Sequence, residues 1–139
     1  MTDLHPRLNV LIAHAGKSLW VPGLARSLAP LPVGLHWSHS DDEAIGMAAG
    51  RGMHVAVVDG DLPPRGGLDT LRRMRRMGLE LPCLLVCDDP GPRLLRDAIE
   101  LDVFSVVHSR GEGELLTPMV LRIVQRVYEV EWPMPGEFN

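Results

Sequence analysis

The sequence predicts one α/β domain, in which a parallel sheet of five strands is covered by helices on both faces. Five short apolar segments alternate with five helix-like segments along 139 residues. The central apolar segments contain almost no polar residues, which is typical of parallel strands buried on both faces. The chain length suits a single domain, and 45% hydrophobic with 23% charged residues is the balance of an ordinary globular protein.

The strands are expected where apolar and β-branched residues gather between Gly- and Pro-containing stretches. These segments are residues 8–14, 33–37, 54–59, 81–87 and 103–107. Each is short, as strands in α/β domains usually are.

The helix-like segments are residues 18–29, 41–52, 67–78, 93–102 and a last one within roughly 110–131. Pro22 fits the first helix only in its first turn, where the missing N–H has no partner in any case. Ser40 and Glu43 have the capping-box spacing that begins the second helix. An apolar face marks the third helix, made of Leu68, Leu71 and Met74.

The start of the last helix has two alternatives. Ser109 and Glu112 form a second capping-box pattern, which places the start near residue 110. Pro118 would interrupt a helix that begins there, so Thr117 is the alternative cap, with Pro118 at the first helical position.

Right-handed crossovers and the chain length favour a flavodoxin-like (βα)5 doubly wound sheet with the strand order 2-1-3-4-5. In such a sheet, ligands bind at the carboxyl ends of the strands, beside the switch in strand order. The candidate site residues are therefore Ala13, His14, Asp59 to Asp61, Cys87 to Asp89 and His108 to Arg110. We expect the domain to span residues 1–131 and residues 132–139 to be a C-terminal tail or linker remnant.

Composition narrows the classes of partner and compartment. The net charge of −4 argues against direct binding of nucleic acid, which usually needs a basic surface. Cys83 and Cys87 lie in one predicted strand, too far apart for a disulfide, so they suit a reducing compartment. The N-terminus lacks a signal-peptide pattern, and no apolar run approaches bilayer length. We expect a soluble, cytoplasmic protein that contacts neither nucleic acid nor membrane.

The stretch Asp59-Gly60-Asp61-Leu62-Pro63, with Gly67 opening the next helix, resembles the receiver domain of response regulators, the CheY-like superfamily. The family pattern is an Asp, two residues, an apolar residue, a Pro, and a Gly four residues later. The resemblance covers roughly residues 8–130 and implies a role in two-component signal transduction or transcriptional regulation. It also implies that Asp59 matches the phosphoacceptor, with Mg²⁺ held by that residue and by an acidic pair after the first strand.

The other receiver positions differ from the family pattern. The resemblance places the acidic pair at Ala13 and His14, the Ser or Thr at Cys87, the aromatic switch at Ser105 and the Lys at His108. Phe104, one place before the switch position, is expected to face the opposite side of the sheet. A carboxylate attacks another anion only when a metal and a cation screen the charge. The sequence therefore indicates an atypical pseudo-receiver that is not an enzyme, needs no cofactor and is not phosphorylated by the usual Mg²⁺-dependent route.

Three interpretations of Asp59 stay open. It can cap its own loop through the carboxylate. It can be a phosphoacceptor whose metal site is restored by Asp61, in which case Mg²⁺ is the cofactor. It can also join His14, Asp61 and His108 in a transition-metal sensor that binds an ion such as Zn²⁺.

Two further surfaces are candidates for a protein partner. The third helix carries the densest basic cluster, which can dock an acidic partner or RNA but is more commonly a solvated helix face: Arg72, Arg73, Arg75 and Arg76. The last helix is expected to pack on the sheet through Leu116, Met119, Val120, Ile123, Val127 and Val130. Three more residues, Leu121, Val124 and Tyr128, extend its apolar arc towards solvent. We expect these three to form an interaction surface for a partner protein or a homodimer, unless the tail folds back over them.

Overall fold

A computed structural model of the chain describes residues 8–50, 52–110 and 112–129. Its elements alternate in the order β1 (Leu8–Ala13), α1 (Val21–Leu28), β2 (Val33–Ser38), α2 (Asp41–Gly50), β3 (Val55–Asp59), α3 (Gly67–Arg76), β4 (Cys83–Cys87), α4 (Pro92–Glu100), β5 (Ser105–His108), a 3-10 helix η1 (Gly113–Leu115) and α5 (Leu116–Tyr128). The predicted strands and helices are confirmed, with ends that differ by a few residues. The predicted boundary between residues 131 and 132 lies outside the described residues.

The sheet has the order β2-β1-β3-β4-β5, and every neighbouring pair is parallel. The predicted flavodoxin-like topology is therefore confirmed. Because β1 pairs with both β2 and β3, the winding direction changes at β1. The register aligns Ala13 with Val58, and Cys87 with His108. The carboxyl ends of the strands consequently meet at one edge, where the candidate residues were expected.

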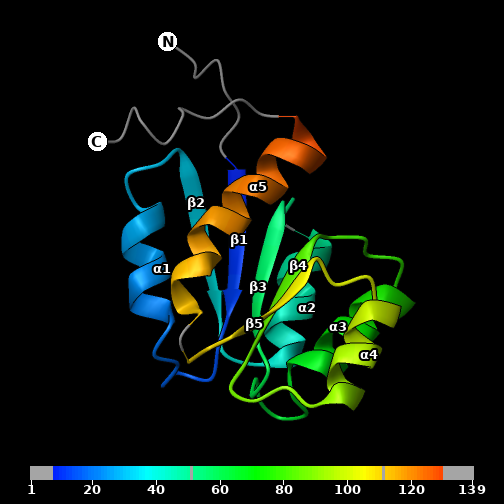
Figure 1. Cartoon of the computed structure of the whole chain (residues 1–139). Helices are drawn as coiled ribbons and strands as arrows, with labels where there is room; N and C mark the ends of the chain where they lie inside the picture. The colour runs from blue at the N-terminus through cyan, green and yellow to red at the C-terminus, as the bar shows by residue number, and fades with distance from the viewer. Residues whose placement is uncertain (1–7, 51, 111, 130–139) are drawn as a thin grey trace.

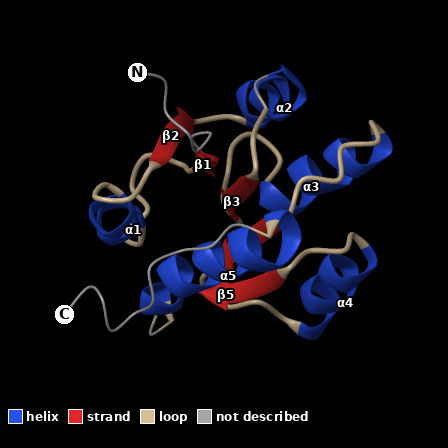
Figure 2. Ribbon diagram, turned by 90° about the horizontal axis from the view of Figure 1, so that it is seen from above, coloured by secondary structure: helices blue, strands red, loops and turns tan. Residues whose placement is uncertain are grey.

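Helices cover both faces of the sheet (Figures 1 and 2). On one face, α1 and α5 pack with apolar side chains of the strands in a single buried cluster. On the other face, α2, α3 and α4 close a second cluster that contains both cysteines. Cys83 and Cys87 are free and buried, as predicted. None of the described helices is long and apolar enough to cross a membrane.

The start of α5 differs from both predicted alternatives. A turn of 3-10 helix precedes it, and α5 begins at Leu116 without a side-chain cap, so Pro118 is its third residue. The Ser109 hydroxyl donates to Asp88 instead of capping the helix. The Glu112 carboxylate accepts the N–H of His108 rather than that of Ser109. These side chains fasten the loop after β5, which sequence spacing alone does not reveal.

The predicted interaction surface on α5 is wrong in its central residue. Val124 is only 1% exposed and belongs to the cluster in which α1 and α5 pack together on the sheet. Leu121 packs partly against the same cluster, and the Tyr128 hydroxyl donates to the carbonyl of His54 at 2.6 Å. Val127, expected on the core face, is instead 49% exposed. The prediction failed because α1 lies against α5, and this contact covers apolar surface that we had assigned to solvent.

The arginines of α3 mostly bind within the protein. Arg73 pairs with Asp41 and Asp42 at 2.9 Å, which joins α3 to the start of α2. The guanidinium of Arg72 lies 3.9 Å from Asp69 and from Asp97. The guanidinium of Arg75 donates to the carbonyls of Leu79 and Leu101. Three of the four arginines therefore connect elements of the fold, and the sequence cluster is no general docking surface for an acidic partner.

Candidate functional site

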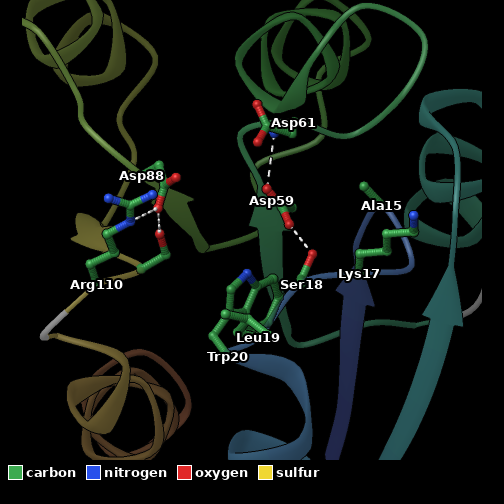
Figure 3. Close-up of a pocket in the computed structure, with 10 residues that line it drawn as sticks. Ala15, Lys17, Ser18, Leu19, Trp20, Asp59, Asp61, Asp88 and Arg110 are labelled. Carbon is green, nitrogen blue, oxygen red and sulfur yellow. Dashed lines mark hydrogen bonds and ion pairs between the residues drawn. The ribbon is translucent and has the colours of Figure 1, made fainter.

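A pocket of about 260 Å³ opens at the carboxyl edge of the sheet, beside the switch in strand order (Figure 3). We call it the Asp59 pocket. Its walls come from the loop after β1, the end of β3 and the loops after β4 and β5. The lining residues include Lys17, Ser18, Trp20, Asp59, Asp61, Asp88 and Arg110.

Asp59 ends β3 and is 8% exposed, and its carboxylate is engaged on both oxygens. Oδ1 accepts the backbone N–H of Asp61 at 2.9 Å, so the carboxylate caps its own loop. Oδ2 accepts the hydroxyl of Ser18 from the loop after β1 (Figure 3). Asp59 thus joins two loops that are far apart in the sequence.

Two glycines allow the backbone to close tightly around Asp59. A methyl group on Gly67 would overlap the carbonyl oxygen of Asp59 and lie 2.9 Å from Val58. A methyl group on Gly60 would lie 2.9 Å from the sulfur of Cys87. The Gly67 N–H donates to the carbonyl of Gly60 at 3.0 Å, which fixes α3 against the Asp59 loop. The Gly of the receiver-like pattern therefore has a steric reason in this fold.

Ser18 and Lys17 are pocket residues that sequence reasoning missed. Lys17 is the only lysine in the chain, and this is the one sequence feature that could have drawn attention to it. It lines the pocket, but Figure 3 shows its side chain extending towards Ala15 rather than towards Asp59. Ser18 carries no sequence signal, because its contact with Asp59 depends on the path of the loop after β1.

The two positions after β1 supply no carboxylate. Ala13 is fully buried in the second cluster. His14 is buried too, and its ring packs edge-on against Trp37 at 5.8 Å and His39 at 4.6 Å between ring centroids. Burial, and then the neighbouring His39, lower the pKa of His14, while Asp59 acts in the opposite direction. The imidazole therefore favours its neutral form, and its Nδ1 accepts the N–H of Gly16.

The residues after β4 and β5 offer little to a phosphoryl group. Burial, and then the carboxylates of Asp59 and Asp61, raise the pKa of Cys87 to about 11, so the thiol stays protonated and is a weak donor. His108 is exposed. Arg110 brings a cation to the edge of the pocket. Its Nε lies 3.3 Å from Oδ1 of Asp88, so this guanidinium is already paired with a carboxylate.

Ser105, which the resemblance assigns to the aromatic switch position, is the first residue of β5 and is half-buried. Phe104 was expected on the opposite side, but it packs against the same cluster as Val107. Val107 shares a face with Ser105 by the two-residue alternation of a strand. The prediction failed because Phe104 lies before the regular strand begins.

The described residues do not form the predicted transition-metal site. Among them, no group of three His, Cys, Asp or Glu side chains is arranged to hold a metal ion. His14 turns towards Trp37 and His39, and its Nδ1 is occupied by the N–H of Gly16. Asp59 and Asp61 do lie together, but the Asp59 oxygens are already engaged. The donor set fits a divalent ion poorly.

His14, which is buried, and His54, which is half-buried, predict a loss of stability in acid. Burial lowers the pKa of His54, whose Nδ1 accepts the N–H of Asn9 at 2.9 Å, as it also lowers that of His14. Folding therefore favours the neutral imidazoles. Their contribution to the free energy of unfolding is present above pH 6.5, the ordinary pKa of histidine, and is lost as the pH falls below that value, because the unfolded chain then binds protons more readily than the folded one. When the pH is lowered, we expect the free energy of unfolding to fall less in the double variant His14→Asn/His54→Asn than in the unmodified chain. Urea titrations at about pH 7.5 and about pH 5.5 measure it.

The exposed His108 is the control for this measurement, because His108→Asn should keep the full acid dependence. An equally steep loss in the double variant would assign the acid sensitivity to the carboxylates.

The solved structures to which this chain is similar share one fold. No protein-family model matches the chain, and no curated protein matches it in sequence. The structure is similar to a signal receiver domain from Vibrio parahaemolyticus, with a TM-score of 0.80 and 15% identity over 89% of this chain and 95% of that one. It is similar to the receiver domain of an HD domain-containing protein from Pseudomonas fluorescens, with a TM-score of 0.79 and 19% identity over 93% and 95%. Chemotaxis protein CheY4 from Vibrio cholerae matches with a TM-score of 0.73 and 15% identity over 85% and 99%. At these identities the likeness establishes the fold, which is that of receiver domains.

Proposed function

We propose that this chain is an atypical receiver domain, which acts in signal transduction as a protein-interaction module and is not phosphorylated by the usual Mg²⁺-dependent route. One observation carries the proposal: both carboxylate oxygens of Asp59 accept hydrogen bonds from the protein itself, from Ser18 and Asp61. The receiver fold supports the proposed role in signal transduction. The hydrogen bonds that occupy the Asp59 carboxylate argue against its phosphorylation.

The physical reason concerns charge. Phosphoryl transfer to a carboxylate brings two anions together, so cations must face the reacting oxygens. Here Ala13 and His14 stand where the resemblance expects metal-binding carboxylates, and His108 stands where it expects a lysine. A hydroxyl and a backbone N–H hold Asp59 as a loop cap but do not supply that positive charge.

The face formed by α4, β5 and α5 is the proposed partner surface, for another protein or for a homodimer. It exposes two large apolar side chains on α4, Leu95 and Ile99. β5 is an edge strand, so its outer side is open to a partner. These residues replace the buried Val124 as the centre of the expected contact.

Intact mass spectrometry tests the chemistry. We expect no phosphoryl adduct after incubation with acetyl phosphate and Mg²⁺, because the Asp59 site lacks the cations that transfer needs. A phosphorylatable receiver in the same reaction is the positive control. A single adduct that disappears in Asp59→Asn would overturn this part of the proposal.

A phosphorylatable receiver is the second candidate, because Lys17 lines the pocket that contains Asp59 and Asp61. An ammonium turned towards Asp59 would supply part of the missing charge. This candidate requires Mg²⁺ or Mn²⁺ to raise the melting temperature, and Asp61→Ala to abolish the rise. Asp89→Ala, at an exposed carboxylate that does not line the pocket, is the matched control.

A further inference from the structure

A second hollow lies at the opposite end of the sheet from Asp59. It has a volume of about 580 Å³, and residues next to the amino-terminal ends of β4 and β5 and the last turn of α5 line it. We call it the acidic groove. Its apolar residues are Leu79, Pro82, Leu101, Phe104 and Val127, and its acidic residues are Glu80, Glu100 and Asp102.

The floor of the acidic groove is apolar and incompletely covered. Leu79, Pro82, Leu101 and Phe104 are each half-buried, and Val127 is exposed. Three separate segments contribute these side chains, so the apolar surface is continuous in space although it is scattered in the sequence. An apolar hollow of this kind is typical of a site that receives a partner's side chains.

The rim of the groove is negatively charged. Glu80, Glu100 and Asp102 are exposed, and none of them forms an ion pair with another described residue. Among the described residues, Arg75 is the one cation that lines the groove, and its guanidinium donates to the carbonyls of the surrounding loops. The lining of the groove therefore carries three carboxylates against one guanidinium, a balance that favours cationic groups.

We propose that the acidic groove docks a basic amphipathic segment of another protein. Apolar side chains of that segment cover Phe104 and Leu101, and its lysines or arginines face the three carboxylates. The chain's own tail is a poor occupant, because from residue 129 onward it carries three glutamates and neither lysine nor arginine. A second copy placed by two-fold symmetry would bring like charges together.

Fluorescence anisotropy with the full chain tests this proposal. The probe is a fluorescein-labelled amphipathic helical peptide built from leucine and lysine, compared with a counterpart that has glutamate for lysine. We expect the lysine peptide alone to bind, and Glu80→Gln/Glu100→Gln to weaken binding about tenfold, as the loss of two attractive charges implies. The matched control, Asp89→Asn/Glu114→Gln, changes the net charge equally at exposed carboxylates outside the groove and should retain the affinity.

A second pair of variants tests the apolar floor. Val127→Lys places a cation and a longer side chain in the groove and should also weaken binding about tenfold, whereas Leu115→Lys, at another exposed apolar residue, should not. Equal weakening in either matched pair, or binding of the glutamate peptide, would overturn the proposal. A concentration-dependent dimer that light scattering detects and Val127→Lys dissociates would assign the groove to a second copy, and would overturn it as well. The groove does not include Asp59, so these outcomes are independent of whether Asp59 is phosphorylated.

Discussion

Gly67→Ala is expected to lower the free energy of unfolding by about 2–3 kcal/mol, the cost of forcing a methyl group into a closely packed site. The added carbon would overlap the carbonyl oxygen of Asp59 and approach Val58 Cγ1 at 2.9 Å. The obstacle at Asp59 is backbone rather than a flexible side chain. Either α3 must move away from β3 or the end of β3 must distort.

Either movement would destabilise the fold further. The N–H of Gly67 donates to Gly60, and the N–H of Gly66 donates to Leu62 at 2.7 Å, so the start of α3 is tied to the loop that it would have to leave. Leu62 is fully buried beneath this loop. A shift of α3 would therefore break hydrogen bonds and open the core together.

Urea unfolding at neutral pH measures the effect, and the chain offers a matched control. Gly46 lies inside α2, and a methyl group there would meet no atom within 4 Å. Gly46→Ala should raise the free energy of unfolding by about 0.5–1 kcal/mol, because alanine is the better helix former. Equal effects of the two substitutions would show that packing around Asp59 is looser than the structure indicates.

Arg75→Met should lower the free energy of unfolding by about 2–3 kcal/mol, the scale on which hydrogen bonds to a charged group contribute. Its Nε donates to Leu101 at 2.8 Å, and its Nη1 donates to Leu79 at 2.7 Å and Leu81 at 3.0 Å. One side chain thus fastens the loop before β4 to the loop before β5. Methionine keeps much of the apolar stem but leaves these carbonyls without their donor.

The neighbouring Arg76 is the control for this experiment. It is exposed, and among the described residues it makes no side-chain hydrogen bond or ion pair, so Arg76→Met should change stability by less than about 0.5 kcal/mol. The decrease in the free energy of unfolding for Arg75→Lys should lie between those for Arg76→Met and Arg75→Met, because an ammonium cannot reach carbonyls on two sides as a planar guanidinium does. If Arg75→Met were as mild as Arg76→Met, the carbonyls would be satisfied by water instead.

The fold was largely predictable because its signals are local. Each strand is a short apolar run such as 83–87, and each crossover carries a helix pattern between turn residues. With right-handed crossovers, these elements leave few topologies for a chain of this length. The position of Asp59 at the carboxyl edge of the sheet follows from the same reasoning, whereas only the resemblance to receiver domains places Ala13 and His14 where carboxylates are expected.

The contacts around the site were not predictable, because they join residues that are distant in the sequence. Ser18 lies 41 positions from Asp59, and nothing near either residue marks the pairing. Phe104 was misplaced because strand alternation was extended one residue too far.

The sequence by itself determined the layered α/β fold and the edge of the sheet that holds Asp59. Hydrophobic periodicity and residue identity suffice for these conclusions. Tertiary structure alone decided that Ser18 occupies the Asp59 carboxylate, that Val124 is buried while Val127 is exposed, and that Arg75 binds backbone carbonyls. The reason is that periodicity shows which residues must leave water, whereas only the packing of α1 against α5, and of one loop against another, decides what covers them.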